Sequence, residues 1–473
     1  MSRILLATLG SLGDLNPVLA MAKALEEAGH RVRVAANPMH TDTARRQGLE
    51  FVPLGQLADP TDLASHDRTS DVRDDAIAFV DHANFGQLDR LFDDLFAAAD
   101  SADMLLAPHH VVPAHLVAAK RDIPWLAYTL SPAYLVEQTR LSDKRGSTPP
   151  LPPARWHAAL AALRHRIGLP RRLFPYAAVF QDSPTILGLF PAFLLEPGIT
   201  VNNLEVMGFP HSALVHTAHS ADPGLLAFCD DRTVIFSFGS FVDRINPQHM
   251  FEQSVAACRA LGLKCLYLSQ FVGATAPDAG DVMIRGFVDH AAVFPRVGAI
   301  VHHAGVGTLI AACAAAKPMV TVPFLYDQPY HAQRMAALVD APVLPAARYS
   351  RDTLVDALRQ ALEQAPVVSA QLAALMSKET NGTLQLVRAV AARSGVARAA
   401  PDAASERVWQ PGRLTVVASE VLCDRERRSP LIGNQFLGRA RESVPFDPAG
   451  LDAALIVDAG GRAAVEAEER AEG

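Results

Sequence analysis

Short apolar runs alternate with stretches of helical spacing along the first 390 or so residues of the chain. This alternation predicts parallel strands with helices on both faces, because consecutive parallel strands are joined by crossover helices. In the first part of the chain the strand-like runs are residues 3–9, 32–36, 51–53, 104–107, 125–129, 185–190 and 204–209.

A second series of the same kind begins with the strand-like run 233–238. Its first loop, Gly239-Ser240-Phe241, repeats Gly10-Ser11-Leu12 of the first series, and both loops reach an Asn-Pro pair before a helix. We therefore predict two similar domains. Their boundaries are residues 1–209 and 232–394, with a polar linker at 210–231.

The composition changes after Ser394, where Ala, Arg, Glu and Gly dominate and the strand-like runs 414–417 and 455–457 are isolated. We expect the extension 395–473 to be largely disordered, with its acidic end in solvent. The alternative is a small added interaction element.

A polar loop at residues 10–17 follows the first strand and carries one carboxylate, Asp14. Pro17 suits the first position of a helix over residues 18–28, and Gly29 suits its end. Two roles are open for Asp14: it could cap this helix, or it could act as a base in the loop.

A glycine turn between a strand at 298–301 and a helix at 309–316 suits anion binding. Glycines allow a ligand to approach the backbone, and the helix offers unpaired N–H groups to a negative charge. The next strand ends at the same edge of the sheet with a carboxylate and an amide, which suit the binding of hydroxyl groups. The residues of this segment are His303, Gly305, Gly307 and Thr308, and then Asp327 and Gln328.

These two loops resemble the signatures of family 1 glycosyltransferases, which use UDP- or dTDP-sugars. The resemblance covers about residues 1–393 and is strongest toward bacterial rhamnosyltransferases and macrolide-type enzymes. It implies a GT-B fold, an α/β architecture of two Rossmann-like, doubly wound parallel-sheet domains facing across a cleft. The N-terminal domain would bind the acceptor and the C-terminal domain the nucleotide-sugar donor.

The resemblance also assigns roles to individual residues. Asp14 takes the place of the general base. The diphosphate would be held by His303, Gly305, Gly307, Thr308, Gly239 and Ser240, and the donor sugar by Asp327 and Gln328. Phe287 stands where an aromatic residue stacks on the nucleotide base, and His109 with His110 belongs to the acceptor region.

One departure from the family pattern concerns the ribose. Many relatives have an acidic residue that holds the ribose hydroxyls, eight positions after the diphosphate histidine, and this chain has Ala311 there. The change is compatible with a deoxyribose donor such as a dTDP-sugar.

Composition narrows the class of protein further. A chain of 473 residues with a net charge of −7 predicts two or three domains and argues against nucleic acid as a partner. Five cysteines without a C-x-x-C pair indicate reduced thiols in a cytoplasmic protein. No run approaches the length of a transmembrane helix, although a lipid acceptor would allow peripheral membrane contact.

The sequence thus predicts an inverting glycosyltransferase that moves a hexose or deoxyhexose to a hydroxyl of a lipid or hydrophobic natural product. We expect neither a metal site nor a resident cofactor, since no Asp-x-Asp motif adjoins a donor strand and the nucleotide sugar is a co-substrate. Two alternatives share the fold: a UDP-sugar epimerase and a catalytically silent partner protein.

Overall fold

A computed structural model describes most of the chain up to residue 394 and four short strands beyond it. The described residues are 1–56, 84–133, 135, 154–172, 183, 185–199, 201, 203–210, 222–239, 246–272, 280–394, 414–416, 442–444, 453–457 and 463–467. The chain divides into two compact units. The first comprises Met1–Ala133, Thr185–Gly198 and Asn203–Arg388, and the second comprises Tyr134–Pro184, Ile199–Asn202 and Ala389–Gly473.

The first unit contains a seven-stranded sheet in the order β3-β2-β1-β4-β5-β6-β7, and every pairing in it is parallel. The alternation of strand and helix in the sequence therefore predicts this half correctly. Its strands are β1 (Arg3–Ala7), β2 (Arg31–Ala36), β3 (Glu50–Pro53), β4 (Met104–Pro108), β5 (Trp125–Thr129), β6 (Ile186–Gly188) and β7 (Leu204–Val206).

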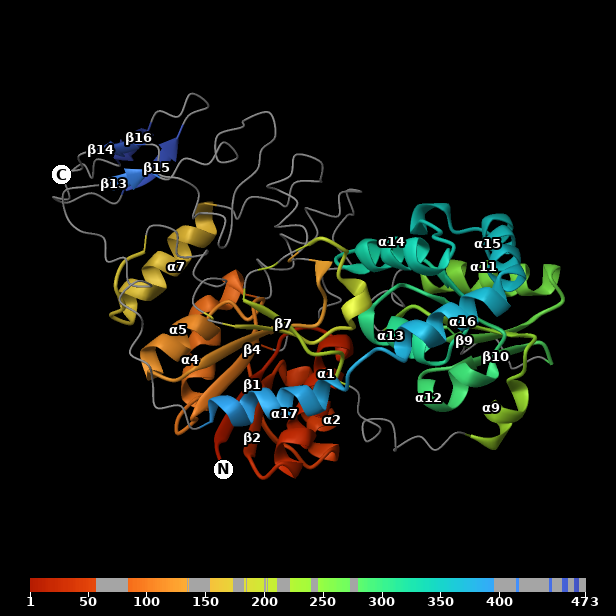
Figure 1. Cartoon of the computed structure of the whole chain (residues 1–473), viewed down its shortest axis with the longest axis horizontal. Helices are drawn as coiled ribbons and strands as arrows, with labels where there is room; N and C mark the ends of the chain where they lie inside the picture. The colour runs from red at the N-terminus through yellow and green to blue at the C-terminus, as the bar shows by residue number, and fades with distance from the viewer. Residues whose placement is uncertain are drawn as a thin grey trace. The chain divides into compact units, whose positions relative to one another are not determined.

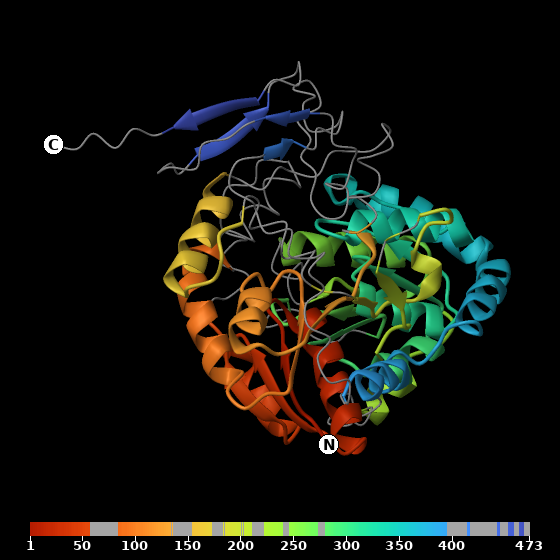
Figure 2. The ribbon, with the colours of Figure 1, turned by 60° about the vertical axis from the view of Figure 1, so that its left-hand side comes forward.

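Helices lie on both faces of this sheet. In Figure 1, α1 and α2 lie on one side of the strands, and α4 and α5 lie on the other. Figure 2 shows the red and orange helices again on opposite sides of the red strands. The bounds of these helices are α1 (Leu12–Glu27), α2 (Thr41–Arg46), α4 (Leu88–Ala98) and α5 (Ala114–Arg121).

The same unit contains a five-stranded sheet in the order β10-β9-β8-β11-β12, again with every pairing parallel. Its strands are β8 (Thr233–Ser237), β9 (Lys264–Leu268), β10 (Val282–Arg285), β11 (Ala299–His302) and β12 (Met319–Thr321). The accompanying helices are α9 (Pro223–Phe228), α11 (Pro247–Ala260), α12 (His290–Val293), α13 (Val306–Ala314), α14 (Gln328–Val339), α15 (Arg351–Glu363) and α16 (Ala365–Met376). The helix α17 (Gly382–Arg393) follows, and its last residues belong to the second unit.

Two hydrophobic cores cover the faces of the five-stranded sheet. Ile300 belongs to the core that also contains α13 and α16 residues such as Leu309 and Leu372. The next residue along the strand, Val301, belongs to the core that contains Leu354 and Leu358 of α15. Successive side chains of a strand point to opposite faces, so a strand buried on both sides reads as a continuous apolar run.

The end of the first half is packed against a much later segment. Thr380 Oγ1 donates a hydrogen bond to the carbonyl of Met207, over 2.9 Å. A Cβ on Gly208 would lie 2.2 Å from the Thr380 carbonyl oxygen, and a Cβ on Gly382 would lie 2.2 Å from the Gly208 carbonyl oxygen. Only glycine fits at either position while the two segments remain this close.

The structure differs from the sequence-based expectations at two places. The first helix begins at Leu12 rather than at 17 or 18, so Pro17 lies inside it. The predicted linker 210–231 contains the helix α9, which Asp222 caps by accepting a hydrogen bond from the Gly224 N–H.

The described residues of the extension form two antiparallel strand pairs, β13 (Leu414–Val416) with β14 (Glu442–Val444) and β15 (Ala453–Val457) with β16 (Ala463–Ala467). That the extension is largely disordered stays a prediction. β13 and β15 coincide with the two strand-like runs of the sequence, and the rest of the extension lies outside the described residues.

Candidate functional site

The candidate residues follow the carboxyl ends of parallel strands. Asp14 and His110 follow β1 and β4, and His303 and Asp327 follow β11 and β12. The crevice outside the carboxyl ends of the strands is where open α/β sheets bind their ligands. The order of strands and helices thus assembles the site.

Asp14 lies in the first turn of α1, where it forms a capping box with Ser11. Its Oδ2 accepts a hydrogen bond from the Ser11 N–H at 2.9 Å, and Ser11 Oγ accepts one from the Gly13 N–H at 3.2 Å. This reciprocal cap satisfies backbone donors at the start of the helix. It explains why the helix begins before Pro17, whose ring costs one internal hydrogen bond.

The pKa of Asp14 is raised above its usual value, and burial of the carboxylate is the largest cause. Positive charge on His110 and the bond from Ser11 act in the opposite direction, while the charge of Asp327 raises the pKa further. A carboxylate with a raised pKa is a stronger base than a solvated one. The capping role and the base role of Asp14 are therefore compatible.

The two adjacent histidines after β4 have different environments. His109 is buried, and its ring lies edge-on to Trp125 with the centroids 6.2 Å apart. Burial lowers the pKa of His109 to about 3. The ring of His110 contacts the Leu9 carbonyl through Nε2 at 3.1 Å and acts electrostatically on Asp14. The structure thus brings His110 to the candidate site and places His109 in the core.

His40 is a further residue near Asp14 that the sequence did not single out. Its ring is buried, and its Nε2 lies 2.9 Å from the Gly10 carbonyl oxygen. Together with His110 it holds the backbone of residues 9 and 10 that leads into the first turn of α1, and positive charge on it lowers the pKa of Asp14.

His303 lies in the loop between β11 and α13, residues 303–305, which is called the donor loop below. It contacts β8, the first strand of the second half. Its Nδ1 lies 3.3 Å from the Ser237 carbonyl oxygen. Because a carbonyl only accepts, Nδ1 carries a proton and Nε2 of the neutral ring does not. Burial lowers the pKa of His303 to about 4, so the ring is neutral at pH 7 in the absence of a ligand.

The glycines in and around the donor loop are required for different structural reasons. A Cβ on Gly239 would lie 2.8 Å from Cε1 of His303, so Gly239 makes room for the imidazole. A Cβ on Gly305 would lie even closer to the same ring, 2.2 Å from its Nε2. A Cβ on Gly307 would meet no atom within 4 Å, which leaves open space at the start of α13. Only Gly307 fits the expectation of a glycine that lets a ligand approach.

α13 begins at Val306, with Gly305 as its N-cap and Thr308 half-buried in its first turn. No side chain caps this helix. Its first N–H groups therefore remain available to an anion, together with the positive end of the helix dipole.

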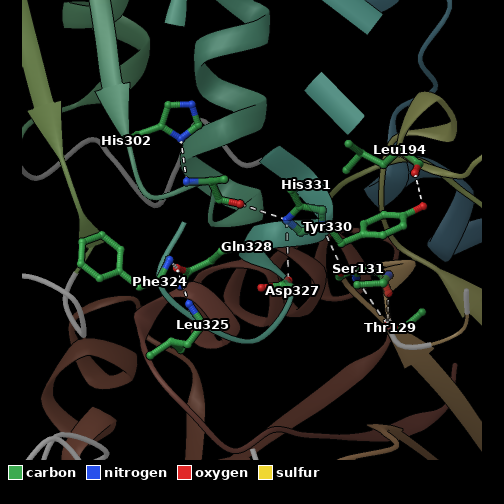
Figure 3. Close-up of polar contacts among 12 residues, drawn as sticks. Thr129, Ser131, Leu194, His302, Phe324, Leu325, Asp327, Gln328, Tyr330 and His331 are labelled. Carbon is green, nitrogen blue, oxygen red and sulfur yellow. Dashed lines mark hydrogen bonds and ion pairs between the residues drawn. The ribbon is translucent and has the colours of Figure 1, made fainter. Parts of the chain in front are cut away.

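Asp327 and Gln328 lie at the start of α14, and their side chains have different environments. Asp327 is about one-third exposed. Gln328 is buried, and its Oε1 accepts hydrogen bonds from the N–H groups of Phe324 at 2.9 Å and Leu325 at 3.2 Å. Figure 3 shows Gln328 closing this turn. A sugar hydroxyl would therefore meet the amide nitrogen of Gln328 rather than its oxygen.

Phe287 follows β10 with 41% of its surface exposed. Its ring lies roughly parallel to His290, with centroids 6.1 Å apart, and His290 stacks on Phe294 at 4.2 Å. An exposed aromatic face with ring support beneath it suits stacking on a nucleotide base. Ser240, the other expected contact on this side, lies outside the described residues.

Two side chains that sequence analysis missed connect the two halves. His331 of α14 is fully buried, and its Nε2 lies 2.8 Å from Oγ of Ser131, which follows β5. Its place four residues after Asp327, one helical turn away, was the only signal in the sequence. Among the described residues, no group of three or more His, Cys, Asp or Glu side chains is arranged to hold a metal ion.

The described helices include none long and apolar enough to span a membrane.

The sequence matches two domain models of one family. Residues 4–72 match the glycosyltransferase family 28 N-terminal domain, and residues 271–386 match the glycosyltransferase family 28 C-terminal domain. The first match contains Asp14, and the second contains Phe287, His303 and Asp327.

Curated relatives extend over most of the chain. Glycosyltransferase GtfE of Amycolatopsis orientalis is 28% identical over 71% of this chain and 84% of its own length. The O-mycaminosyltylonolide 6-deoxyallosyltransferase of Streptomyces fradiae is 26% identical over 76% of this chain and 90% of its own length. A sterol 3-beta-glucosyltransferase of Arabidopsis thaliana is 25% identical over 82% of this chain and 65% of its own length.

Solved structures show the same fold. The glycotransferase of kitacinnamycin has a TM-score of 0.64 at 23% identity, over 83% of this chain and 99% of that one. Glycosyltransferase VinC, solved in complex with dTDP, has a TM-score of 0.61 at 20% identity over 83% of this chain and all of that one. Both sheets agree with the GT-B fold of these solved structures, and the chain is similar to glycosyltransferases over most of its length and to the two family 28 domains in the two matched segments.

Proposed function

We propose that the enzyme transfers a hexose or deoxyhexose from a nucleoside-diphosphate sugar to a hydroxyl of a hydrophobic natural-product or lipid acceptor, with inversion at the anomeric carbon. One observation carries this proposal. Asp14 of the N-terminal half and Asp327 of the C-terminal half are close enough for the charge of one to raise the pKa of the other. This coupling supports the proposal that a base and a sugar-binding carboxylate share one site.

In the proposed reaction, Asp14 accepts the proton of the acceptor hydroxyl while that oxygen attacks the anomeric carbon. The bond from the anomeric carbon to the diphosphate oxygen breaks on the opposite face of the sugar, and the nucleoside diphosphate leaves with the electron pair. Proton transfer of this kind to a positioned carboxylate typically contributes about 10²–10⁴-fold to the rate.

The leaving diphosphate would be stabilised by the uncapped start of α13, with Gly307 and Thr308 in its first turn. Fixed backbone dipoles of this kind stabilise developing negative charge without reorganisation. We include in the proposal that no metal ion is needed, and transfer should then persist in excess EDTA. Loss of transfer with EDTA, restored by Mg²⁺ or Mn²⁺, would contradict this point.

The acceptor class is proposed from the relatives, whose names refer to a glycopeptide aglycone, a macrolide and sterols. The absence of an acidic residue at Ala311 supports a deoxyribose nucleotide, and dTDP-sugars are therefore the donors to try first. The described part of the acceptor-binding half includes Asp14, His110 and Ser131, while residues 136–153 lie outside it.

The test is a matrix of dTDP- and UDP-sugars against macrolide, glycopeptide and sterol acceptors, read by mass spectrometry. A product heavier than the acceptor by one glycosyl unit, with inverted anomeric configuration by NMR, supports the proposal. A product isomeric with the donor would indicate the epimerase alternative. Retained configuration would contradict the single-displacement mechanism.

A further inference from the structure

Ala304 has a backbone conformation that residues other than glycine rarely adopt. Its φ is +65°, in the left-handed region. The residue lies between His303 and Gly305, so this conformation determines how the chain turns from β11 into the first turn of α13. It is fully buried, so both polar groups of its peptide need partners within the protein.

Both partners are histidines. The N–H of Ala304 donates to Nδ1 of His302 over 3.2 Å, and the carbonyl oxygen of Ala304 lies 3.0 Å from Nδ1 of His331. His331 comes from α14, and it is therefore the partner that fixes Ala304 from outside the loop.

The tautomer of His331 follows from these contacts. The Ala304 carbonyl can only accept, so Nδ1 of His331 carries a proton. Nε2 of the neutral ring is then an acceptor, and the hydroxyl of Ser131 donates to it over 2.8 Å. Ser131 Oγ in turn accepts from the N–H of Ala133 at 3.2 Å. Each polar atom of the ring is thereby assigned one partner.

Asp327 is not the hydrogen-bond partner of this ring. Its Oδ2 is 3.8 Å from Nδ1 of His331, beyond hydrogen-bond distance, while the Ala304 carbonyl is at 3.0 Å. The carboxylate therefore stays available to a sugar hydroxyl.

We propose that His331 is a positioning residue: its Nδ1–H holds Ala304 in the left-handed conformation that shapes the diphosphate-binding loop, and its Nε2 connects that loop to Ser131 of the acceptor-binding half. This inference rests on the proposed function, because it assigns a role to the loop in holding the donor. It goes beyond that function because neither His331 nor Ser131 touches a reacting group.

The two bonds of His331 have separable effects. His331→Phe removes both and leaves the buried Ala304 carbonyl without a partner, which should weaken nucleoside diphosphate binding roughly 10- to 100-fold. His331→Asn keeps an N–H near the position of Nδ1 and should bind within about threefold of the unaltered enzyme. Ser131→Ala removes only the bond between the halves. It should leave the Kd of the nucleoside diphosphate unchanged and lower kcat about three- to tenfold.

The matched control is Tyr330→Phe. Tyr330 is adjacent to His331 and also bonds across the halves, but its Oη donates to the Leu194 carbonyl at 2.7 Å rather than to Ala304. It should lower the Tm while keeping both the Kd and kcat. Ser131→Ala combined with His331→Asn should have the kcat of His331→Asn alone, because both changes remove the same bond.

The binding experiment is calorimetric titration of the full-length protein with dTDP and UDP, and kcat is measured with whichever donor supports transfer. Normal dTDP affinity of His331→Phe, or an equal loss of kcat in Tyr330→Phe and Ser131→Ala, would overturn the proposal. Failure of the unaltered enzyme to bind either nucleotide would instead count against the proposed function.

A second measurement does not depend on any ligand. In ¹⁵N-histidine-labelled protein, the His331 signals are assigned by their absence in His331→Phe. They should report a protonated Nδ1 and an unprotonated Nε2, and Ser131→Ala should shift the Nε2 signal. A proton on Nε2 in place of Nδ1 would overturn the proposed arrangement whether or not the enzyme transfers sugar.

Discussion

The imidazole of His303 occupies the space that a side chain at Gly305 would need. A Cβ on Gly305 would lie 2.2 Å from Nε2 of His303, far inside van der Waals contact. The ring is also in contact with Gly239 on another side and lies near the Ser237 carbonyl. Gly305 thus leaves the space in which the His303 ring lies. The conformation of the loop accommodates both residues.

Gly305→Ala should therefore displace the His303 ring and weaken nucleoside diphosphate binding. Gly307→Ala is the matched control for the fold, because its Cβ meets no atom within 4 Å. In a helix, alanine is favoured over glycine by about 0.5–1 kcal/mol, so Gly307→Ala should raise the free energy of unfolding. Calorimetric titration with dTDP and urea unfolding measure the two quantities. Equal dTDP affinity for Gly305→Ala and the unaltered enzyme would contradict the role given to the His303 ring.

Asp14→Asn should lose most transfer without losing stability. The pKa of Asp14 is raised in the fold, so its protonated carboxyl group stabilises the fold fully below the unfolded pKa of about 3.8, and that contribution is lost as the pH rises through the higher folded pKa. At pH 7 Asn removes the cost of burying the charge and can still accept the Ser11 N–H, so Tm should be equal or higher. The kcat should fall about 10²–10⁴-fold.

Asp14→Ala separates the two roles of this residue. It removes the bond to the Ser11 N–H as well as the base, so it should be slow and also less stable, by about 1 kcal/mol. An Asn variant with normal kcat would remove Asp14 from the mechanism and direct attention to His110, whose ring acts on the same carboxylate.

Nucleotide binding should take up a proton at His303. The pKa of the free protein's His303 is lowered to about 4 by burial, and a bound diphosphate would raise it. The affinity for the nucleotide should then increase as the pH falls from 7.5 to 5.5. Binding takes up protons because the pKa of His303 is higher in the bound protein than in the free protein. Titration of dTDP in two buffers of different ionisation enthalpy counts the protons. His303→Gln, which stays neutral, should reduce the count; an unchanged count would exclude His303 as the source.

Acid should destabilise the fold before most carboxylates titrate. His109 and His302 have pKa values lowered to about 3, and His303 to about 4, all mainly by burial. Each stays neutral in the fold but gains a proton in the unfolded chain below about pH 6.5. The free energy of unfolding should therefore fall between pH 6.5 and 4, by up to about 1.4 kcal/mol per pH unit for each histidine.

His109→Phe tests this linkage because it replaces a ring that packs edge-on against Trp125 with one that cannot titrate. The slope of the urea unfolding free energy against pH, rather than its absolute value, is the readout. The slope for the variant should be smaller by the amount that one titrating histidine contributes. An identical slope would show that His109 is protonated equally in both states.

The pattern of apolar runs predicts the sheets well, since burial on both faces forces continuous apolar strands. β5 has the predicted bounds, and β11 is displaced by one residue so that it includes His302. The predicted start of α1 is wrong because the bonds between Ser11 and Asp14 begin the helix before Pro17.

The sequence predicts the positions of the candidate residues better than their contacts. Asp14, His303 and Asp327 each follow a strand, as the spacing along the chain indicates. Nothing in the spacing shows that His109 enters the core while His110 turns toward Asp14, because adjacent residues after a strand point in different directions. The bond of His331 to Ser131 joins residues 200 positions apart and depends on how the two halves meet.

The contact at Gly208 has a consequence for how the chain folds. Thr380 reaches Met207 across 173 positions, and the backbones of Gly208 and Gly382 touch. During synthesis the N-terminal sheet can form early, but this contact can form only after residues 380–382 have emerged. Contacts between such distant residues close late and slowly.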